Sequence, residues 1–280
     1  MNPQISARTR VFALLGDPVA HSSSPTIQNA AMGDLVLDGV YVALKTTADQ
    51  MVGFVRGLAM SGGGGNITLP HKEKAATLVD VRSSAVKRTG ACNTFWLEEG
   101  EVHGDNTDVE GFSRALEVFL GASPEGQRVL VLGAGGAARA CLVGLMDGGV
   151  EAIHLLNRTR DRARIVARRL GGARVRVLDG PDDAQGESYD LVVNTTRLGL
   201  EPDDPLPMDL SRLGRVGAVM DMVYLDRPTP FVEAALDMGI RATDGLEMLV
   251  QQGAVSFERW WGRRPSLEVM RASARRDVEP

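Results

Sequence analysis

Val129-Leu-Val-Leu-Gly-Ala-Gly-Gly-Ala-Ala-Arg139 is the stretch of this chain in which a strand, a turn and a helix start follow directly from the residue types. Four aliphatic residues predict a buried strand, and Gly133-x-Gly135-x-x-Ala138 predicts a tight turn into a helix. Gly135 has no side chain that would keep a pyrophosphate from the backbone, and small Ala138 lets the helix pack on the strand. The helix N-terminus favours phosphate. Glycine-rich turns without a ligand are common, but strand, spacing and helix together predict a bound dinucleotide.

The second strand of this unit indicates which dinucleotide is bound. Ala152-Ile-His-Leu-Leu156 is followed by Asn157-Arg-Thr-Arg-Asp-Arg162, where an NAD enzyme usually carries an acidic residue for the ribose 2′-hydroxyl. Arg158 and Arg162 can instead pair with a 2′-phosphate through charge-assisted, bidentate hydrogen bonds. The sequence therefore predicts NADP rather than NAD. The alternative is that this run is only the solvated start of the next helix.

The composition allows two modest domains and limits the partners. The chain has 280 residues, of which 44% are hydrophobic, and its net charge is −5 with a pI of about 5.5. These values argue against nucleic acid and membrane surfaces as partners. No apolar run reaches the roughly 18 residues of a membrane span, and the N-terminus lacks the apolar core of a signal peptide. We expect a soluble, cytoplasmic protein with a small-molecule substrate, and a homodimer remains an option.

The cysteines and histidines do not form a metal pattern. Cys92 and Cys141 lie in segments that are predicted to be buried, and the four histidines are scattered without ligand spacing. Two reduced structural thiols are the simplest interpretation. We therefore predict that the protein has no metal site.

The first strand and helix of the chain enclose a serine-rich turn. Residues 8–15 predict a buried strand, and an amphipathic helix is expected from Thr26 to about Leu37. Between them, Ser22 and Ser24 are two residues apart in a segment predicted to be extended, so that both could face an anionic group of a ligand. Hydroxyls ahead of a proline-started helix are often only caps, and local pattern alone favours capping.

A second polar segment follows a strand at 40–44, a helix at 49–60 and the glycines 62–65. Alternation places Asn66 and Thr68 on one face of a short strand, which suggests a strand face that lines a polar site. Pro70 is expected to start a helix with Lys72 in its first turn, where the macrodipole disfavours a cation. Lys72 is therefore a candidate proton donor or acceptor. An ordinary surface lysine is the alternative on local grounds.

A third polar segment follows a strand predicted over 90–96, with a polar break at Asn93. After a turn at 98–100, the chain returns through Asn106-Thr-Asp108, which precedes a helix predicted over 112–120. These polar residues could cap that helix. They could also carry a carboxylate into a site, and Asp108 is then the candidate.

The remaining elements complete the dinucleotide unit and then leave it. Strands are predicted at 174–178, 191–193 and 218–220, and Asn194-Thr-Thr196 ends one of them at the edge where open α/β sheets bind ligands. Asp244 and Glu247 resemble a capping box for a long apolar helix, in which Gln252 is a polar interruption that could reach a ligand. We expect this helix to pack on the N-terminal domain.

The predicted fold is α/β, with an N-terminal substrate domain and a Rossmann-type, doubly wound dinucleotide-binding domain separated by a cleft. The substrate domain is expected over residues 1–110 and is completed by C-terminal helices in 245–280. The Rossmann domain is expected over residues 111–244.

Eight motifs in order make the chain similar to the shikimate dehydrogenase family. They are His21-Ser-Ser-Ser-Pro25, Asn66-Ile-Thr-Leu-Pro-His-Lys72, Gly90-Ala-Cys-Asn-Thr94, Asn106-Thr-Asp108, Gly133 to Arg139, Asn157-Arg-Thr159, Asn194-Thr-Thr196 and Asp244-Gly-Leu through Gln252. The resemblance overrides the local preference for capping at the serines and for a surface lysine at position 72. It implies reversible hydride transfer between NADPH and the ring ketone of 3-dehydroshikimate.

The resemblance also implies roles for individual residues. Lys72 and Asp108 would be the catalytic pair, and Ser22 and Ser24 would bind the substrate carboxylate. The ring hydroxyls would be bound by Asn66, Thr68, Asn93 and Gln252. The cofactor would be bound by Gly133, Ala134, Gly135, Gly136, Ala137, Asn157, Arg158, Thr159, Arg162, Thr195, Met222 and Gly245.

The chain departs from the family pattern at three places. Gln28 stands where the family usually has histidine, Leu225-Asp-Arg227 replaces the usual Asn-Pro, and the glycine run 62–65 is longer than expected. These departures leave a quinate or aminoshikimate dehydrogenase as the main alternative, because one buried hydrogen-bonding group can discriminate such substrates. A dinucleotide sensor without turnover is a further alternative, but it predicts loss of Lys72 or Asp108, and both are present.

Overall fold

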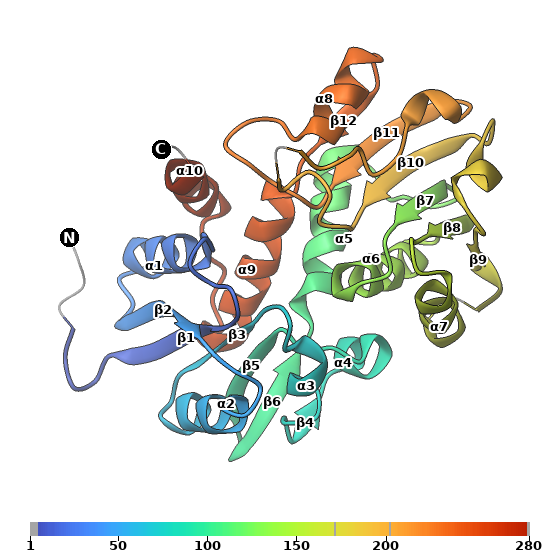
Figure 1. Cartoon of the computed structure of the whole chain (residues 1–280). Helices are drawn as coiled ribbons and strands as arrows, with labels where there is room; N and C mark the ends of the chain where they lie inside the picture. The colour runs from blue at the N-terminus through green and yellow to red at the C-terminus, as the bar shows by residue number, and fades with distance from the viewer. Residues whose placement is uncertain (1–4, 171, 202, 279–280) are drawn as a thin grey trace. The chain divides into compact units, whose positions relative to one another are not determined.

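The computed structural model describes residues 5–170, 172–201 and 203–278. The chain divides into two compact units, which we call unit 1 and unit 2 (Figure 1). Unit 1 contains the residues up to Gly111 and those from Leu249 onward, whereas unit 2 runs from Phe112 to Met248. The divisions therefore fall inside two helices, α5 (Thr107–Leu120) and α9 (Leu246–Trp261). The outermost ends of the predicted substrate domain, 1–4 and 279–280, lie outside the described residues.

Unit 1 is built on a mixed sheet, which has the order β2-β1-β3-β5-β6-β4 within the described part of the chain. Its strands are β1 (Arg10–Gly16), β2 (Gly39–Lys45), β3 (Gly64–Ile67), β4 (Val81–Arg82), β5 (Thr94–Glu98) and β6 (Glu101–Asp105). Its helices, besides the first turn of α5 and most of α9, are α1 (Ser24–Asp34), α2 (Met51–Met60), α3 (Lys72–Ala75), α4 (Ser84–Thr89) and α10 (Leu267–Val278). β5 runs antiparallel to β3 and β6, while the other pairs are parallel. As a result β1, β3 and β6 end, and β5 begins, at one edge of the sheet, which we call the site edge of unit 1.

The two faces of the unit 1 sheet are covered by different helices. On one face Ala13 and Leu15 pack with Val55 and other residues of α2. On the other, Phe12 contacts both tryptophans of α9, with ring centroids 4.9 Å from Trp260 and 5.3 Å from Trp261. Helix α9 thus completes the core of unit 1, as its apolar pattern predicts.

The glycine run of unit 1 has a steric cause. A Cβ atom at Gly64 would lie 2.5 Å from the carbonyl oxygen of Phe95, and one at Gly65 would lie 2.2 Å from that of Ala13. Strand β3 therefore lies between its neighbours where side chains at these positions would clash with backbone. The unusual length of the run reflects this packing rather than a flexible loop.

Unit 2 is built on a parallel sheet of order β12-β11-β10-β7-β8-β9, again within the described residues. Its strands are β7 (Arg128–Leu132), β8 (Ala152–Leu156), β9 (Val175–Val177), β10 (Tyr189–Asn194), β11 (Val216–Asp221) and β12 (Arg241–Thr243). Its helices, besides most of α5, are α6 (Gly136–Asp147), α7 (Arg160–Leu170) and α8 (Pro230–Asp237), with short 3₁₀ turns at Gly172–Arg174, Pro181–Ala184 and Leu210–Arg212. In chain order from β7 this is the 3-2-1-4-5-6 arrangement of dinucleotide-binding sheets. The switch point lies between β7 and β10.

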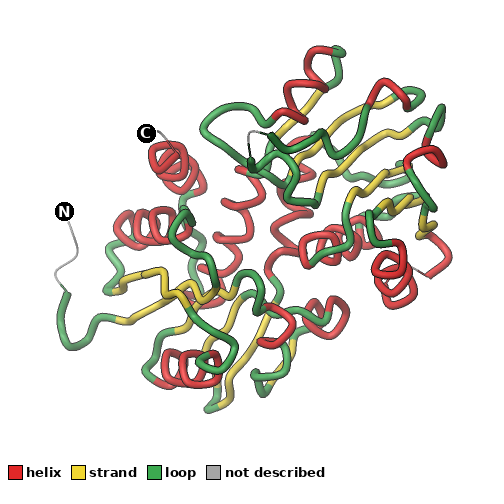
Figure 2. The backbone as a smooth tube through the Cα atoms, in the orientation of Figure 1, coloured by secondary structure: helices red, strands yellow, loops and turns green. Residues whose placement is uncertain are grey.

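Both faces of the unit 2 sheet are buried. Val129 and Val131 of β7 pack with α5, α6 and α7, whereas Leu130 and Leu132 pack with α8 and the 3₁₀ turns. Figure 2 shows these helices in red around the yellow strands. Burial on both faces explains why the strands are continuous apolar runs rather than alternating ones.

The predicted α/β fold class, with a Rossmann-type part, is confirmed, but several element bounds were wrong. α1 begins at Ser24 rather than Thr26, β5 begins at Thr94 rather than near Gly90, and α5 begins at Thr107 rather than Phe112. α3 is a single turn of four residues. Across the residues that the structure describes, every helix is too short or too polar to cross a bilayer.

Candidate active site

The site edge of unit 1 gathers most of the residues predicted to carry chemistry. Ser22 and Ser24 follow β1, Thr68 and Lys72 follow β3, Asn93 precedes antiparallel β5, and Asp108 follows β6. Because β1, β3 and β6 end where β5 begins, these positions share one edge of the sheet. This explains how segments up to 86 positions apart in the chain, from Ser22 to Asp108, come to one side of the unit.

Lys72 and Asp108 form a direct ion pair at this edge. The distance from Lys72 Nζ to Asp108 Oδ2 is 2.7 Å, and the two side chains are 20% and 9% exposed. α3 has only one turn, so the expected influence of a helix macrodipole on Lys72 is small. The charged group in direct contact with Lys72 is the Asp108 carboxylate. A partly exposed ammonium held by a buried carboxylate can donate a hydrogen bond to a ligand and keep its orientation.

Asn93 holds the other side of the Asp108 carboxylate. Its Nδ2 donates to Asp108 Oδ1 at 2.8 Å, and its Oδ1 accepts from the Thr107 backbone N–H at 2.8 Å. The Thr107 N–H is only a donor, so it fixes which end of the Asn93 amide points to the carboxylate. This contact explains why α5 begins earlier than predicted. Asn93, which is distant in sequence, accepts a hydrogen bond from the N–H of Thr107, and the helix therefore begins at Thr107 and includes Asp108.

Asn66, a predicted substrate ligand, has an amide that is largely bound by residues of unit 1. Its Oδ1 accepts from the Tyr41 hydroxyl at 2.8 Å, and its Nδ2 lies within hydrogen-bond distance of the Asn93 carbonyl, Thr94 Oγ1 and Ser256 Oγ, at 3.1, 2.9 and 2.9 Å. The residue is buried. These partners occupy the amide N–H groups and one lone pair of Oδ1, so the second lone pair of Oδ1 is the acceptor left for a ligand, and the substrate contact of Asn66 stays a prediction.

Ser22 and Ser24 face each other, although not for the predicted reason. The segment is a turn rather than extended backbone, and Ser24 is the first residue of α1. Ser22 Oγ donates to Ser24 Oγ at 3.1 Å and accepts from the Ser24 backbone N–H at 3.3 Å. The N-cap residue, Ser23, makes no side-chain capping bond. Ser22 Oγ therefore satisfies the first backbone N–H of α1, while the Ser24 hydroxyl, which accepts from Ser22, keeps its own proton for another acceptor.

Thr68 and Gln252 are half-buried and keep polar groups that the protein does not use. The Thr68 hydroxyl has no hydrogen-bond partner among the described residues, while its backbone N–H donates to Leu15. Gln252 Nε2 donates to the Leu249 carbonyl at 2.9 Å, which leaves the side-chain oxygen without a partner in the described part of the chain. Both residues can accept or donate a hydrogen bond to a ligand.

Three hydroxyl groups close to Asn93 were not identified from the sequence as part of the site. Thr94, Thr107 and Ser256 form a triangle with Oγ to Oγ distances of 2.9, 3.0 and 3.1 Å. All three residues are buried, and Ser256 also donates to the Gln252 carbonyl at 3.0 Å. The threonines lie in the predicted motifs, but Ser256 sits in an apolar helix pattern with no local sign of a role.

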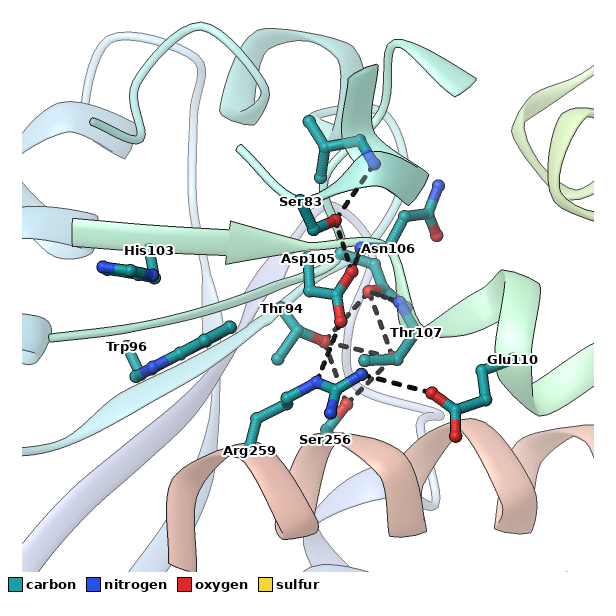
Figure 3. Close-up of polar contacts among 12 residues, drawn as sticks. Ser83, Thr94, Trp96, His103, Asp105, Asn106, Thr107, Glu110, Ser256 and Arg259 are labelled. Carbon is teal, nitrogen blue, oxygen red and sulfur yellow. Dashed lines mark hydrogen bonds and ion pairs between the residues drawn. The ribbon is translucent and has the colours of Figure 1, made fainter. Parts of the chain in front are cut away.

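Arg259 is a second residue of α9 that supports the start of α5 (Figure 3). Its Nε donates to Asp105 Oδ2 at 3.0 Å and its Nη2 to Glu110 Oε2 at 3.2 Å. Asp105 is buried and also accepts from Ser83 Oγ at 2.5 Å. The guanidinium thus connects a residue before Asp108 with one after it. It therefore stabilises the turn from which the Asp108 side chain extends.

The glycine-rich turn of unit 2 has the geometry expected for a phosphate-binding turn. Gly133 has φ +107°, and a Cβ there would lie 2.6 Å from Thr195 Oγ1. At Gly135 and Gly136, by contrast, a Cβ would meet no described atom within 4 Å. Gly133 is therefore required by the fold, while the other two glycines leave the start of α6 open to a ligand. An anionic group at this helix N-terminus fits the residues present.

The two arginines after β8 are also placed for an anion. Arg158 and Arg162 are exposed and form no ion pair with a described residue. Their neighbours differ, because Arg160 pairs with Asp179, and Arg164 pairs with Asp161 at 3.4 Å. Asn157 Nδ2 donates to the Thr159 carbonyl at 2.7 Å, which orders the loop that carries Arg158. The donor set suits a phosphate on the ribose of a dinucleotide.

Other predicted cofactor residues lie at the carboxyl ends of β10, β11 and β12. The Thr195 N–H and hydroxyl both donate to the Leu132 carbonyl, at 2.8 and 2.7 Å, which joins β10 to the glycine turn. A Cβ at Gly245 would lie 2.3 Å from the Met222 carbonyl oxygen, so only glycine fits there. Thr195 thus lies at the switch point of the sheet, where such sheets bind ligands, while Met222 and Gly245 follow β11 and β12 at the same edge.

Buried Asp221 organises this end of unit 2. It accepts hydrogen bonds from Asn194 Nδ2 at 2.8 Å, the Val223 N–H at 3.0 Å and Thr229 Oγ1 at 2.7 Å. Burial raises the pKa of the carboxyl above its ordinary value, and these hydrogen bonds oppose the shift. The carboxylate therefore fixes the loop containing Met222.

Known protein families match three parts of the chain. Residues 14–95 match the shikimate dehydrogenase substrate binding domain, residues 116–197 match shikimate / quinate 5-dehydrogenase, and residues 245–275 match the shikimate 5′-dehydrogenase C-terminal domain. The chain is 41% identical over 265 residues to shikimate dehydrogenase (NADP(+)) of Methylocella silvestris, with 94% of each chain covered. It is 40% identical to the enzyme of the same name from Rhizobium rhizogenes, again with 94% of each covered.

A solved structure agrees with these matches. Shikimate 5-dehydrogenase of Thermus thermophilus, in complex with NADP(H) and shikimate, superposes with a TM-score of 0.86 at 36% identity, covering 96% of this chain and 99% of that one. The chain belongs to the shikimate dehydrogenase family. The family resemblance seen in the sequence motifs is thus confirmed, while the role of each residue stays a prediction.

The departures from the family pattern have different surroundings. Gln28 is buried in α1 and donates from Nε2 to the Gly253 carbonyl of α9 at 2.9 Å, next to Gln252. Its side-chain oxygen is buried without a partner among the described residues. Leu225 is half-buried, and Asp226 and Arg227 are exposed. Gln28 is therefore the departure that is built into the packing of unit 1.

Proposed function

We propose that this chain catalyses the NADP-dependent, reversible reduction of 3-dehydroshikimate to shikimate. The observation that carries the proposal is the Lys72 to Asp108 ion pair of 2.7 Å, held by Asn93 at the site edge of unit 1. The Methylocella and Rhizobium relatives, both named shikimate dehydrogenase (NADP(+)), support it. A sensor without turnover has no use for such a pair.

The chain's part in the reaction is proton transfer and charge stabilisation, because bound NADP supplies or accepts the hydride. In the reducing direction the Lys72 ammonium donates a hydrogen bond to the ring ketone oxygen. As that oxygen becomes alkoxide-like, the ammonium stabilises its charge and gives up a proton. Asp108 orients the ammonium through their direct contact. In the oxidising direction the neutral amine of Lys72 takes the hydroxyl proton.

Five residues of unit 1 are proposed to hold the substrate. The hydroxyls of Ser22 and Ser24 bind its carboxylate, which their mutual contact at 3.1 Å supports because it brings the two hydroxyls together. Thr68 and Gln252 bind ring hydroxyls through the groups that have no described partner. Asn93 uses one N–H for Asp108 and has a second for the substrate. We propose unit 1 as the substrate-binding domain.

Unit 2 is proposed as the NADP-binding domain. The glycines of the turn and the N-terminus of α6 bind the pyrophosphate, with Ala134 and Ala137 small enough to leave the backbone accessible. Arg158 and Arg162 bind the 2′-phosphate, with Asn157 and Thr159 beside them. Thr195, Met222 and Gly245 complete the site at the ends of β10, β11 and β12. The open Cβ positions at Gly135 and Gly136 support this assignment.

The test is a set of four initial rates: reduction of NADP and of NAD by the purified protein, each with shikimate and with quinate. The proposal expects fast turnover with shikimate and NADP only. A preference for quinate would move the function to the alternative within the family and make Gln28 the first residue to examine. A preference for NAD would contradict the assignment of Arg158 and Arg162.

We also propose a cytoplasmic location. Cys92 and Cys141 are both buried thiols that do not form a disulfide, which suits a reducing compartment. Fractionation of the source cells would test the location. A homodimer is a separate proposal, and light scattering of the purified protein would test it.

A further inference from the structure

We propose that Tyr41 is a positioning residue for Asp108, acting through a directional chain of hydrogen bonds that crosses three buried side chains. The proposal rests on the proposed function, because orientation of Asp108 affects turnover only if the ion pair with Lys72 takes part in proton transfer. Tyr41 lies in β2, two strands away from β3, and belongs to none of the family motifs named above.

Each link of the chain is short. From the donor end, the hydrogen bonds run from the Tyr41 hydroxyl to Asn66 Oδ1 (2.8 Å), from Asn66 Nδ2 to Thr94 Oγ1 (2.9 Å), from Thr94 Oγ1 to Asn93 Oδ1 (2.9 Å) and from Asn93 Nδ2 to Asp108 Oδ1 (2.8 Å). The Lys72 ammonium donates to the other carboxylate oxygen at 2.7 Å. With the Thr94 hydroxyl donating to Asn93, the donors of the chain point towards the carboxylate. Thr94 Oγ1 also lies 2.9 Å from Ser256 Oγ and 3.1 Å from Thr107 Oγ1, and Thr107 Oγ1 is a second donor to Asn93 Oδ1 at 3.1 Å.

The orientation of the two amides in the chain is fixed by groups that have only one hydrogen-bonding role. The Asn93 backbone carbonyl, 3.1 Å from Asn66 Nδ2, is only an acceptor. If the Asn66 amide were turned over, two oxygens would meet there. Its Oδ1 must therefore face Tyr41, and Tyr41 must donate. At the other end, the Thr107 N–H fixes the Asn93 amide in the same way.

The surroundings of the chain keep it intact. Tyr41, Asn66, Asn93 and Thr94 are all buried, so water does not compete for the bonds. Burial also raises the pKa of the Tyr41 hydroxyl well above its ordinary value, so the group remains a donor at every pH at which the enzyme is assayed. Hydrogen bonds in such a chain polarise one another in a low-dielectric interior. Register supports the arrangement, since Asn66 lies directly opposite Thr94 in the sheet.

Loss of the Tyr41 hydroxyl leaves Asn66 Oδ1 buried without its donor. Asn66 can then relieve the loss only by rotating, which weakens its bond to Thr94 and frees the Asn93 amide from one of its constraints. The ring of Tyr41 can be kept, because Tyr41→Phe preserves its contact with Trp260 at 5.9 Å between centroids. The substitution thus removes one hydrogen bond and little else.

Tyr189 provides a matched control in unit 2. It is also a buried tyrosine, and its hydroxyl bonds to His154 Nδ1 at 2.8 Å. Burial raises its pKa to about 12. It begins β10 at the end of the strand opposite to Thr195. Tyr189→Phe therefore removes a comparable buried hydrogen bond that leads to no site residue.

The experiment compares kcat and KM for shikimate at saturating NADP in wild type, Tyr41→Phe and Tyr189→Phe, with melting temperatures recorded for each. We expect Tyr41→Phe to lower kcat about three- to tenfold through poorer orientation of the pair, with KM changed less than about twofold. Tyr189→Phe should lower the melting temperature similarly and leave kcat within about twofold of wild type. Equal kcat values for the two variants would overturn the proposal.

A second pair of variants covers the case in which Tyr41→Phe does not fold. Thr94→Val removes the central hydroxyl of the chain at nearly the same volume, whereas Thr94→Ser retains it. We expect kcat to fall about tenfold or more in Thr94→Val and to be largely restored in Thr94→Ser. Equal losses of kcat in both variants would assign Thr94 a packing role and contradict the proposed chain of hydrogen bonds.

A readout without turnover separates this inference from the proposed function. The side-chain amide signals of Asn93, assigned by NMR in the ligand-free protein, should shift in Tyr41→Phe and remain in place in Tyr189→Phe. If wild type does not oxidise shikimate, the proposed function fails, but this comparison still tests the hydrogen-bond chain. Unchanged Asn93 signals in Tyr41→Phe would contradict it.

Discussion

At the site edge of unit 1, the Asp108 carboxylate receives hydrogen bonds from Lys72 and Asn93, and Asn93 is itself held by Thr94 and Thr107. The corresponding edge of unit 2 differs. Gly135 and Gly136 have no described atom near their Cβ positions, and the nearby arginines 158 and 162 form no ion pair with described residues. The first edge orients a few reactive groups through the protein, and the second presents backbone and charge outward.

This difference matches the chemistry proposed for each unit. Proton transfer depends on the orientation of a donor to within a fraction of an ångström, so the groups that perform it are held from behind. Binding of phosphates depends on accessible N–H groups and guanidinium charge, which require less internal support. The two edges should therefore respond differently to substitution, one in turnover and the other in cofactor affinity.

The largest expected effect is on the ion pair. Lys72→Ala removes the proposed proton donor, and we expect kcat to fall on the order of 10²-fold or more, measured as initial rates with shikimate and NADP. Lys74→Ala is the control, because Lys74 is an exposed lysine of the same short helix. A loss smaller than about tenfold in Lys72→Ala would contradict the proton-transfer role.

The second largest expected effect is on NADP binding by Arg158 and Arg162. Without Arg158 or Arg162 the 2′-phosphate loses charge-assisted hydrogen bonds, and we expect KM for NADP to rise about 10- to 100-fold for each Ala variant, with little change for NAD. Arg168→Ala, at another exposed position of α7, serves as the control. An equal effect on NAD and NADP would assign these arginines to the solvated helix surface.

The glycine turn separates fold from function within unit 2. Gly135→Ala places a methyl group where no described atom lies within 4 Å, so the melting temperature should not fall, and the control Gly33→Ala, at an open position of helix α1, should raise it slightly. The same methyl group should obstruct the pyrophosphate and weaken NADPH binding about tenfold or more, which fluorescence titration measures. Unchanged NADPH affinity would show that the phosphates bind elsewhere.

The smallest effect concerns a buried group away from either edge. Burial lowers the pKa of His154 from its ordinary value of 6.5. Below pH 6.5 the unfolded chain therefore takes up a proton that the folded chain does not, and the free energy of unfolding falls as the pH drops. In urea titrations between about pH 5 and 8, His154→Gln should reduce this slope by at most about 1.4 kcal/mol per pH unit. A slope unchanged from wild type would exclude His154 as its source, and a loss of NADPH affinity would link this residue to the site.

Local pattern was sufficient for some elements and not for others. The turn from Leu132 through Gly133 into α6 follows from neighbouring residues alone, because strand, glycine spacing and helix are contiguous. The start of α5 was predicted five residues too late, since its first N–H is satisfied by Asn93, which lies 14 positions earlier in the chain. A cap supplied across a sheet leaves no local sequence pattern.

The same limit applies to the candidate site. Lys72 and Asp108 were candidates from local pattern and became a pair through the family motifs, but their distance follows from the pairing of β3, β5 and β6. Asn66 was assigned to the substrate because its motif was recognised, whereas its buried partners depend on register and on the position of α9. Ser256 lies in an apolar helix, so its hydrogen bonds became visible only when that helix was placed on the sheet.

The most direct test of the different roles of the two edges measures the same two quantities on Lys72→Ala and on the double variant Arg158→Ala/Arg162→Ala. For each, NADPH affinity is measured by calorimetry and kcat by turnover of shikimate at saturating cofactor. We predict that Lys72→Ala binds NADPH like wild type and loses turnover, while the double variant binds NADPH weakly and keeps kcat. If Lys72→Ala loses NADPH affinity, or if the double variant loses kcat at saturation, the assignment of chemistry to unit 1 and phosphate binding to unit 2 is wrong.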